Sequence, residues 1–291
     1  MDWPAIAAAS AQRPGLRLPF VVDGRPVGSV ARAHLQALAA DRDLLRIDAD
    51  AVHLVAPAAQ RDTLLDRLHR RLCGQGLIFG WRDEIVSLPD PDTLAPLACI
   101  ERAAARFWGT LTLGAHCTGY VAGADGRPAG IWIAERAASK ATDPGLLDNL
   151  IGGGVPAGQT PWQTLVREGG EEAGLLPATV RGARAGRIVR LCREVREGLQ
   201  QEWLYSHDLQ LSAGLLPQNC DGEVAGFQLL PVAEALALAA SPRMTVDASL
   251  VTLDFALRHA LLAPAAHAAL AAAAEPLWWR GPLPRVATRQ G

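Results

Sequence analysis

The sequence has little net charge and no cysteine spacing typical of a metal site. Its 28 lysines and arginines nearly balance 30 aspartates and glutamates, which gives a net charge of −2 at pH 7. Such a charge creates no long-range field that would attract nucleic acid or an acidic membrane. The five cysteines are odd in number and contain no C-x-x-C pair. We therefore expect reduced thiols in a cytoplasmic protein, and we expect no zinc site.

The sequence also lacks long apolar segments. Its first residues show no basic segment followed by an apolar run, so a secretory signal is not expected. The alanine-rich tract at residues 265–274 is interrupted by His267 and is too short to span a bilayer. We expect it to form a packing or surface helix. At 291 residues the chain is longer than one typical domain.

A strong helix signal follows a glycine-rich loop. Residues 152–154 are all glycine, and Thr160 and Pro161 come shortly after them. Threonine is a good N-cap and proline is favoured at the first helical position, so we predict that a helix begins here. Gly174 is a suitable stop near Pro177.

Three glutamates of this helix share one face. Glu168, Glu171 and Glu172 are three and four positions apart, a spacing that brings side chains together on an α-helix. Their charges repel one another unless a cation lies among them. Carboxylate oxygens are ligands that Mg²⁺ and Mn²⁺ prefer, and these ions can bridge phosphate oxygens. One interpretation is therefore a metal site for a diphosphate, and the other is a solvated acidic face.

The pattern around these glutamates resembles the Nudix box. It runs from Gly153 through Gln159 to Arg167-Glu168-x-x-Glu171-Glu172-x-Gly174-Leu175. Gln159 replaces a glutamate that usually pairs with the arginine, and we expect it to accept a hydrogen bond from Arg167. Gly169 replaces an apolar residue. A glycine inside a helix costs about 1 kcal/mol relative to alanine, so we expect Gly169→Ala to raise stability by about that amount.

Further motifs extend the resemblance over about residues 15–265. They are Trp81-Arg82-Asp83-Glu84, Glu101-Arg102-Ala103-Ala104, His116-Cys117-Thr118-Gly119-Tyr120, Asp221-Gly222-Glu223-Val224 and Asp254-Phe255-Ala256-Leu257-Arg258-His259. Together they look like the Nudix subgroup that carries an extra N-terminal domain. This subgroup is similar to the Nudix half of fungal thiamine pyrophosphokinases and to some plant chloroplast relatives.

The resemblance implies an α/β fold with two domains. We expect a smaller α+β accessory domain at residues 1–104 and a Nudix α/β/α sandwich, with a mixed sheet between helices, at residues 105–291. Local patterns in the first part predict a hairpin at 16–27, helices at 31–40 and 57–74, a strand pair at 77–88 and a helix at 94–107. In the second part they predict strands at 115–122, 129–136, 183–194, 201–211 and 226–230, and helices at 232–240 and 245–262.

The resemblance also implies roles for the box residues. Glu168, Glu171 and Glu172 would bind Mg²⁺ or Mn²⁺ together with the carbonyl of Gly153, and Arg167 would hold the loop and the helix together. Glu223 precedes a predicted strand and is a candidate for a further ligand or a general base. Its alternative role is to cap the turn in which it lies.

Other polar and aromatic residues are candidates for substrate binding. Those that could stack on or hydrogen-bond an organic group are His116, Tyr120, Trp203 and Tyr205. Each of them could instead belong to the core. Arg136 and Lys140 could face phosphate or simply be solvated.

We therefore expect a Mg²⁺-dependent hydrolase of a small organic diphosphate, with thiamine diphosphate or its oxidised analogues as the substrate that the resemblance implies. One alternative is a broad-specificity hydrolase of nucleoside-diphosphate-linked compounds or ADP-sugars. Another is a non-catalytic ligand-binding protein. The expected partner is a small molecule, with no nucleic acid and no membrane, and a homodimer is left open.

Overall fold

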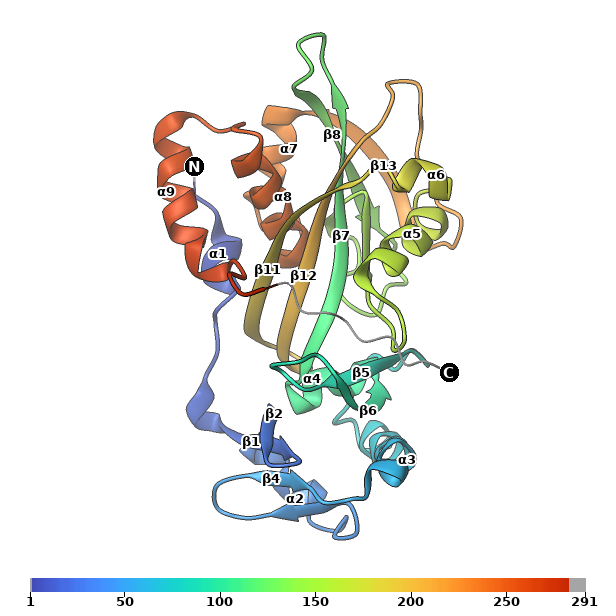
Figure 1. Cartoon of the computed structure of the whole chain (residues 1–291), viewed down its shortest axis with the longest axis vertical. Helices are drawn as coiled ribbons and strands as arrows, with labels where there is room; N and C mark the ends of the chain where they lie inside the picture. The colour runs from blue at the N-terminus through green and yellow to red at the C-terminus, as the bar shows by residue number, and fades with distance from the viewer. Residues whose placement is uncertain (1, 283–291) are drawn as a thin grey trace.

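The computed structural model describes residues 2–282 (Figure 1). Seven strands of these residues form the central sheet: β7 (Leu111–Ala122), β8 (Pro128–Arg136), β9 (Leu147–Asp148), β10 (Ile151–Gly154), β11 (Arg184–Val195), β12 (Gly198–Gln210) and β13 (Val224–Pro231). The long strands lie in the order β11-β12-β7-β8-β13, while β10 pairs with β7 and β9 with β8. Strands β12 and β7 are parallel and the other pairs are antiparallel. The sheet is therefore mixed, as predicted.

Helices cover both faces of this sheet (Figure 1). On one face lie α5 (Pro161–Glu171) and α6 (Pro177–Val180), and on the other lie α7 (Val232–Ala239), α8 (Val246–Arg258) and α9 (Pro264–Ala274). Each face has its own apolar cluster, with Leu165 and Val180 in one and Leu253 and Phe255 in the other. The expected α/β/α sandwich is confirmed. The alanine-rich tract forms α9, as predicted, and buries Leu270.

The first part of the chain forms a separate α+β unit around its own apolar core. Its sheet has the order β2-β1-β4-β3, from β1 (Arg17–Val22), β2 (Arg25–Ala31), β3 (Leu45–Ile47) and β4 (Val52–Leu54). It is followed by α3 (Arg61–Gly74), by the hairpin of β5 (Ile85–Pro89) and β6 (Pro96–Glu101), and by α4 (Arg102–Trp108), with a short α2 (Leu35–Leu38) before β3. The rings of Phe20 and Trp108 stack in the core with centroids 4.3 Å apart. The hairpin predicted at 16–27 is confirmed as β1 and β2.

Two predictions for residues 77–107 are wrong. The expected strand pair at 77–88 is a loop followed by β5, and the expected helix at 94–107 is β6 followed by α4. The proline-rich residues 89–92 lie at the turn between β5 and β6, where the Asp90 Oδ1 accepts the backbone N–H of Asp92 at 2.9 Å and that of Thr93 at 3.1 Å. This side-chain bonding stabilises a turn directly before the residues that we expected to be helical.

Helix α1 (Pro4–Ala8) lies beside α8, away from the first sheet (Figure 1). Trp3 is buried there, and its Nε1 donates to the Ser249 Oγ at 2.8 Å. The boundary between residues 1–104 and 105–291 stays a prediction, and the first residues of the chain pack with the second part. No helix within residues 2–282 is long and apolar enough to cross a membrane.

Candidate active site

The box helix begins where the sequence predicts it. The Thr160 Oγ1 accepts the backbone N–H of Gln163 at 3.2 Å, and the Gln163 Oε1 accepts the backbone N–H of Thr160 at 2.8 Å. This reciprocal capping box, with Pro161 as the first helical residue, fixes the start of α5. Gly174 has a φ of +64°, the left-handed conformation that favours glycine after a helix end.

The glycines of β10 let side chains approach the backbone closely. A Cβ on Gly153 would overlap the Glu168 carboxylate, and a Cβ on Gly154 would overlap the guanidinium of Arg102. The backbone N–H of Gly152 donates to the Glu172 Oε2 at 2.9 Å. The glycine run is therefore required because charged groups from two other elements lie directly against it.

Two of the box glutamates have raised pKa values because they are buried close to other carboxylates. Burial raises the pKa of Glu168 to about 7, and the charge of Glu171 adds to the shift while Arg167 opposes it. Burial, followed by the charge of Glu168, raises the pKa of Glu172 well above its ordinary value. Two buried carboxylates so close together are stabilised by added positive charge.

Arg167 provides part of that positive charge by pairing with two of the glutamates. Its guanidinium donates to the Glu168 Oε1 at 2.7 Å and to the Glu171 Oε2 at 2.5 Å. Gln159 does not brace it: the Gln159 Oε1 accepts a hydrogen bond from the Thr164 Oγ1 at 3.1 Å. The expected hydrogen bond between Gln159 and Arg167 is wrong, because the two glutamates offer charged acceptors and the amide only a neutral one.

The donor set fits a hard divalent cation. Three carboxylates and the Gly153 carbonyl are oxygen ligands of the kind that Mg²⁺ and Mn²⁺ prefer. As they stand, no three His, Cys, Asp or Glu side chains in the described part of the chain are arranged to hold a metal ion. Arg167 pairs with one oxygen of Glu168 and one oxygen of Glu171, so the other oxygen of each carboxylate is not engaged by Arg167.

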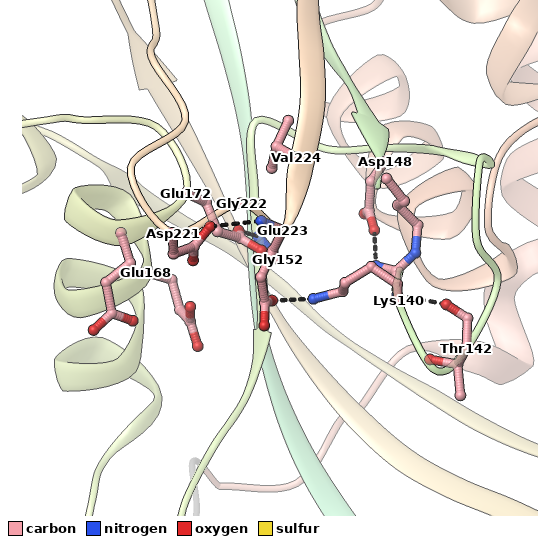
Figure 2. Close-up of polar contacts among 12 residues, drawn as sticks. Lys140, Thr142, Asp148, Gly152, Glu168, Glu172, Asp221, Gly222, Glu223 and Val224 are labelled. Carbon is pink, nitrogen blue, oxygen red and sulfur yellow. Dashed lines mark hydrogen bonds and ion pairs between the residues drawn. The ribbon is translucent and has the colours of Figure 1, made fainter. Parts of the chain in front are cut away.

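A cavity of about 600 Å³ brings most of the predicted site residues together. Those that line it are Arg136, Lys140, Gly153, Arg167, Glu168, Glu171, Glu172 and Glu223. Figure 2 shows Glu168 and Glu172 on one side of Glu223, and Lys140 reaching Glu223 from the other. The cavity thus has an acidic wall at the C-terminal end of α5 and a basic wall at the end of β8 and in the segment after it.

Glu223 does not cap its own turn. That role belongs to Asp221, whose Oδ1 accepts the Glu223 backbone N–H at 2.8 Å. The Glu223 carboxylate forms an ion pair with Lys140 instead. Burial acts to raise the pKa of Glu223, but the hydrogen bond and charge of Lys140, with Arg136, outweigh it and the pKa is lowered. Glu223 is therefore a charged group that faces the cavity.

Three of the predicted aromatic residues lie away from the cavity. Tyr120 packs against Phe255, with ring centroids 5.4 Å apart, on the α8 side of the sheet. Trp203 is buried in a small apolar cluster, against which Tyr205 packs. These positions agree with the alternative in which these side chains belong to the core and do not bind substrate. His116 is buried beside the cavity, where its Nδ1 lies 3.1 Å from the Asn149 Oδ1, and it lines a smaller adjoining hollow.

Several residues of the cavity had no role assigned from the sequence. Arg82, Glu84 and Arg102 come from the first part of the chain. Asp148, at the edge of the site, accepts a hydrogen bond from the Arg136 Nη1 at 2.8 Å. The motifs around Arg82 and Arg102 were visible in the resemblance, but the wrong secondary structure for residues 77–107 hid their position.

Comparisons with known proteins agree with this architecture. The NUDIX domain profile matches residues 115–249, and the profile of a domain of unknown function, DUF4743, matches residues 6–112. The chain is 31% identical over 253 residues to Nudix hydrolase 24, chloroplastic, of Arabidopsis thaliana, covering 85% of this chain and 69% of that protein. Nudix hydrolase 20, chloroplastic, of the same plant is 31% identical over 261 residues, with coverages of 85% and 69%.

The chain therefore belongs to the Nudix hydrolase family, and it is a Nudix-type hydrolase with a DUF4743 region at its N-terminal side. Among solved structures, DR0079 from Deinococcus radiodurans superposes with a TM-score of 0.45 at 18% identity, covering 59% of this chain and 99% of that one.

Proposed function

We propose that the protein hydrolyses the diphosphate bond of a small organic diphosphate with the help of Mg²⁺ or Mn²⁺. The observation that carries this proposal is the cavity in which the three box glutamates face a wall of cationic side chains. A divalent cation held by Glu168, Glu171, Glu172 and the Gly153 carbonyl would neutralise phosphate oxygens and make water more acidic. The remaining roles belong to the side chains around the substrate.

Lys140 and Arg136 are placed to hold the phosphates. Arg136 is braced by Asp148 and by the Thr142 carbonyl at 2.8 Å, so its guanidinium keeps a fixed orientation. Lys140 is paired with Glu223 and can exchange this partner for a phosphate oxygen. Glu223 would then lose the charge that lowers its pKa and become a better proton acceptor for the attacking water.

For the substrate, we propose thiamine diphosphate or its oxidised analogues. This proposal is supported by the resemblance to the Nudix half of fungal thiamine pyrophosphokinases. The names of the plant relatives state only that they are Nudix hydrolases and chloroplastic. A homodimer and a cytoplasmic location stay predictions.

A panel of diphosphates assayed at one Mg²⁺ concentration tests both proposals. We expect oxidised thiamine diphosphate analogues to exceed ADP-ribose and simple nucleoside diphosphates in kcat/KM by at least about tenfold, or about 1.4 kcal/mol in transition-state binding. Equal or better turnover of ADP-ribose would favour the broad-specificity hydrolase. Metal-dependent binding without turnover of any compound would favour the non-catalytic protein.

Glu172→Gln is the matched control for this panel. We expect this variant to lower kcat by orders of magnitude while the fold stays intact, because the substitution removes a metal ligand and also relieves repulsion between buried carboxylates. The thermal unfolding midpoint should be unchanged or higher. Near-normal turnover at saturating Mg²⁺ would contradict the role of the box.

A further inference from the structure

The cationic side chains of the cavity are not equivalent. Within the described residues, those that line it are Arg82, Arg102, Arg136, Lys140 and Arg167. Four of them are paired with carboxylates of the protein: Arg102 with Glu84, Arg136 with Asp148, Lys140 with Glu223, and Arg167 with Glu168 and Glu171. Among the residues that the structure describes, Arg82 has no carboxylate partner. Its guanidinium makes one hydrogen bond, from Nη2 to the Thr142 Oγ1 at 3.4 Å.

The backbone of Arg82 is nevertheless held in place. Its N–H donates at 3.0 Å to Glu101, a buried residue whose carboxylate also caps α4. The next residue, Asp83, has a φ of +56° and accepts a hydrogen bond from the Trp81 Nε1 at 2.8 Å. The loop therefore holds the backbone of Arg82 in place without using its guanidinium. This arrangement is expected of a side chain that is reserved for a ligand.

The surroundings of Arg82 favour an anion. Burial, followed by the positive charges of Arg102 and Arg106, lowers the pKa of Arg82 to about 10, and the negative charges of Glu84 and Glu101 only partly oppose this shift. A guanidinium that is partly removed from water and lies next to like charges is stabilised when an anion binds to it. Its planar fork of N–H donors matches the spacing of phosphate oxygens, so a phosphoryl group is the anion that fits best.

We propose that Arg82 binds the terminal phosphate of the substrate, and that the enzyme therefore prefers monosubstituted diphosphates to diphosphates substituted at both ends. The inference rests on the proposed function in taking a diphosphate as the ligand of the cavity. A terminal phosphate has a second ionisation near pH 6, so it carries additional negative charge that a disubstituted diphosphate lacks. The unpaired guanidinium supplies the matching positive charge. The N-terminal region thus takes part in substrate selection.

Binding in the absence of metal tests Arg82 independently of catalysis. Inorganic pyrophosphate is titrated calorimetrically, with a chelator present, into the full-length protein and three variants. We expect Arg82→Gln to weaken binding at least tenfold and Arg82→Lys to weaken it less, since lysine keeps the charge but loses the fork. Arg46→Gln, which removes an exposed arginine of β3, should bind like the wild type. Thermal unfolding of each variant verifies that it folds.

Turnover then tests the preference for a terminal phosphate. The ratio of kcat/KM for thiamine diphosphate to that for ADP-ribose should fall at least tenfold in Arg82→Gln and stay constant in Arg46→Gln. A constant ratio in both variants would overturn the assignment to the terminal phosphate. No pyrophosphate binding by the wild type, or equal binding by Arg82→Gln, would overturn the whole inference. Pyrophosphate binding that depends on Arg82, in a protein that hydrolyses none of the diphosphates, would refute the proposed function alone.

Discussion

Gly169 and Gly170 are neighbours on α5, yet they meet different surroundings. A Cβ on Gly169 would lie 2.7 Å from the Val180 Cγ2 and 3.2 Å from the Ile151 Cδ1. A Cβ on Gly170 would find its nearest neighbour, the Leu175 carbonyl oxygen, at an ordinary 3.8 Å. Gly169 is therefore the position at which the helix packs closely on β10 and α6, and the helix propensity of alanine would be outweighed there by overlap.

The close packing at Gly169 reverses the change in stability that the sequence predicts for Gly169→Ala. We predict that Gly169→Ala lowers the free energy of unfolding by about 1–3 kcal/mol, whereas Gly170→Ala raises it by up to about 1 kcal/mol. Urea unfolding of the two variants measures both effects. Adding Val180→Ala to Gly169→Ala should reduce the overlap, so the two substitutions should be non-additive. A Gly169→Ala protein more stable than the wild type would contradict the packing.

At the scale of elements, a buried hydrogen bond between His69 and Trp108 links α3 and α4. The His69 Nε2 accepts a hydrogen bond from the Trp108 Nε1 at 2.8 Å, so His69 is neutral with its proton on Nδ1. That buried Nδ1 has no hydrogen-bond partner among the described residues. Burial lowers the pKa of His69 to about 3. Protonation is therefore opposed both by desolvation and by the loss of the acceptor.

The pH dependence of stability follows from this shift. Because the folded pKa lies below the unfolded value of about 6.5, the contribution of His69 is complete above pH 6.5 and is lost as the pH falls from there toward 3. We predict a loss of up to about 1.4 kcal/mol per pH unit in this range. Urea unfolding between pH 7.5 and 5 measures it. His69→Gln keeps an acceptor for Trp108 but does not titrate, so an equal slope in that variant would rule His69 out.

The elements that the sequence predicts well are those with strong local signals. Thr160 and Pro161 define the start of α5 through contacts within a few residues. Residues 96–101 are different, because a short apolar run is compatible with a strand or a helix and only pairing with β5 decides between them. Arg82 likewise reaches the cavity through the contact of its loop with Glu101. Such long-range contacts leave no periodic signal in the sequence.

At the scale of the whole molecule, the first residues of the chain complete the core of the catalytic part. Trp3 is 2% exposed and Ala9 is fully buried, both in the cluster around α8. The Ala9 carbonyl accepts the Cys192 N–H at 2.8 Å, which ties this segment to β11. Residues 3–9, which precede the predicted boundary, therefore belong to the core of the second part. A fragment beginning at residue 105 would lack this portion of its core.

We predict that Trp3→Ala lowers the free energy of unfolding by about 3–5 kcal/mol, because it removes a large buried ring and leaves the Ser249 hydroxyl without its donor. Leu176→Ala, at a side chain that is 71% exposed, serves as the control and should change stability little. Chemical unfolding of both variants makes the comparison. If Trp3→Ala is no more harmful than Leu176→Ala, then α1 is not part of the core.

The pairing of Lys140 with Glu223 has a consequence for chemical labelling. Lys140 is the only lysine of the 291-residue sequence, and the other 27 of its 28 lysines and arginines are arginine. Amine-directed acylating reagents leave guanidinium groups unmodified, so once the α-amino group is blocked they address one side chain, which is 20% exposed and lies in the wall of the cavity. A fluorophore introduced in this way would report the arrival of a ligand without an engineered cysteine or tag.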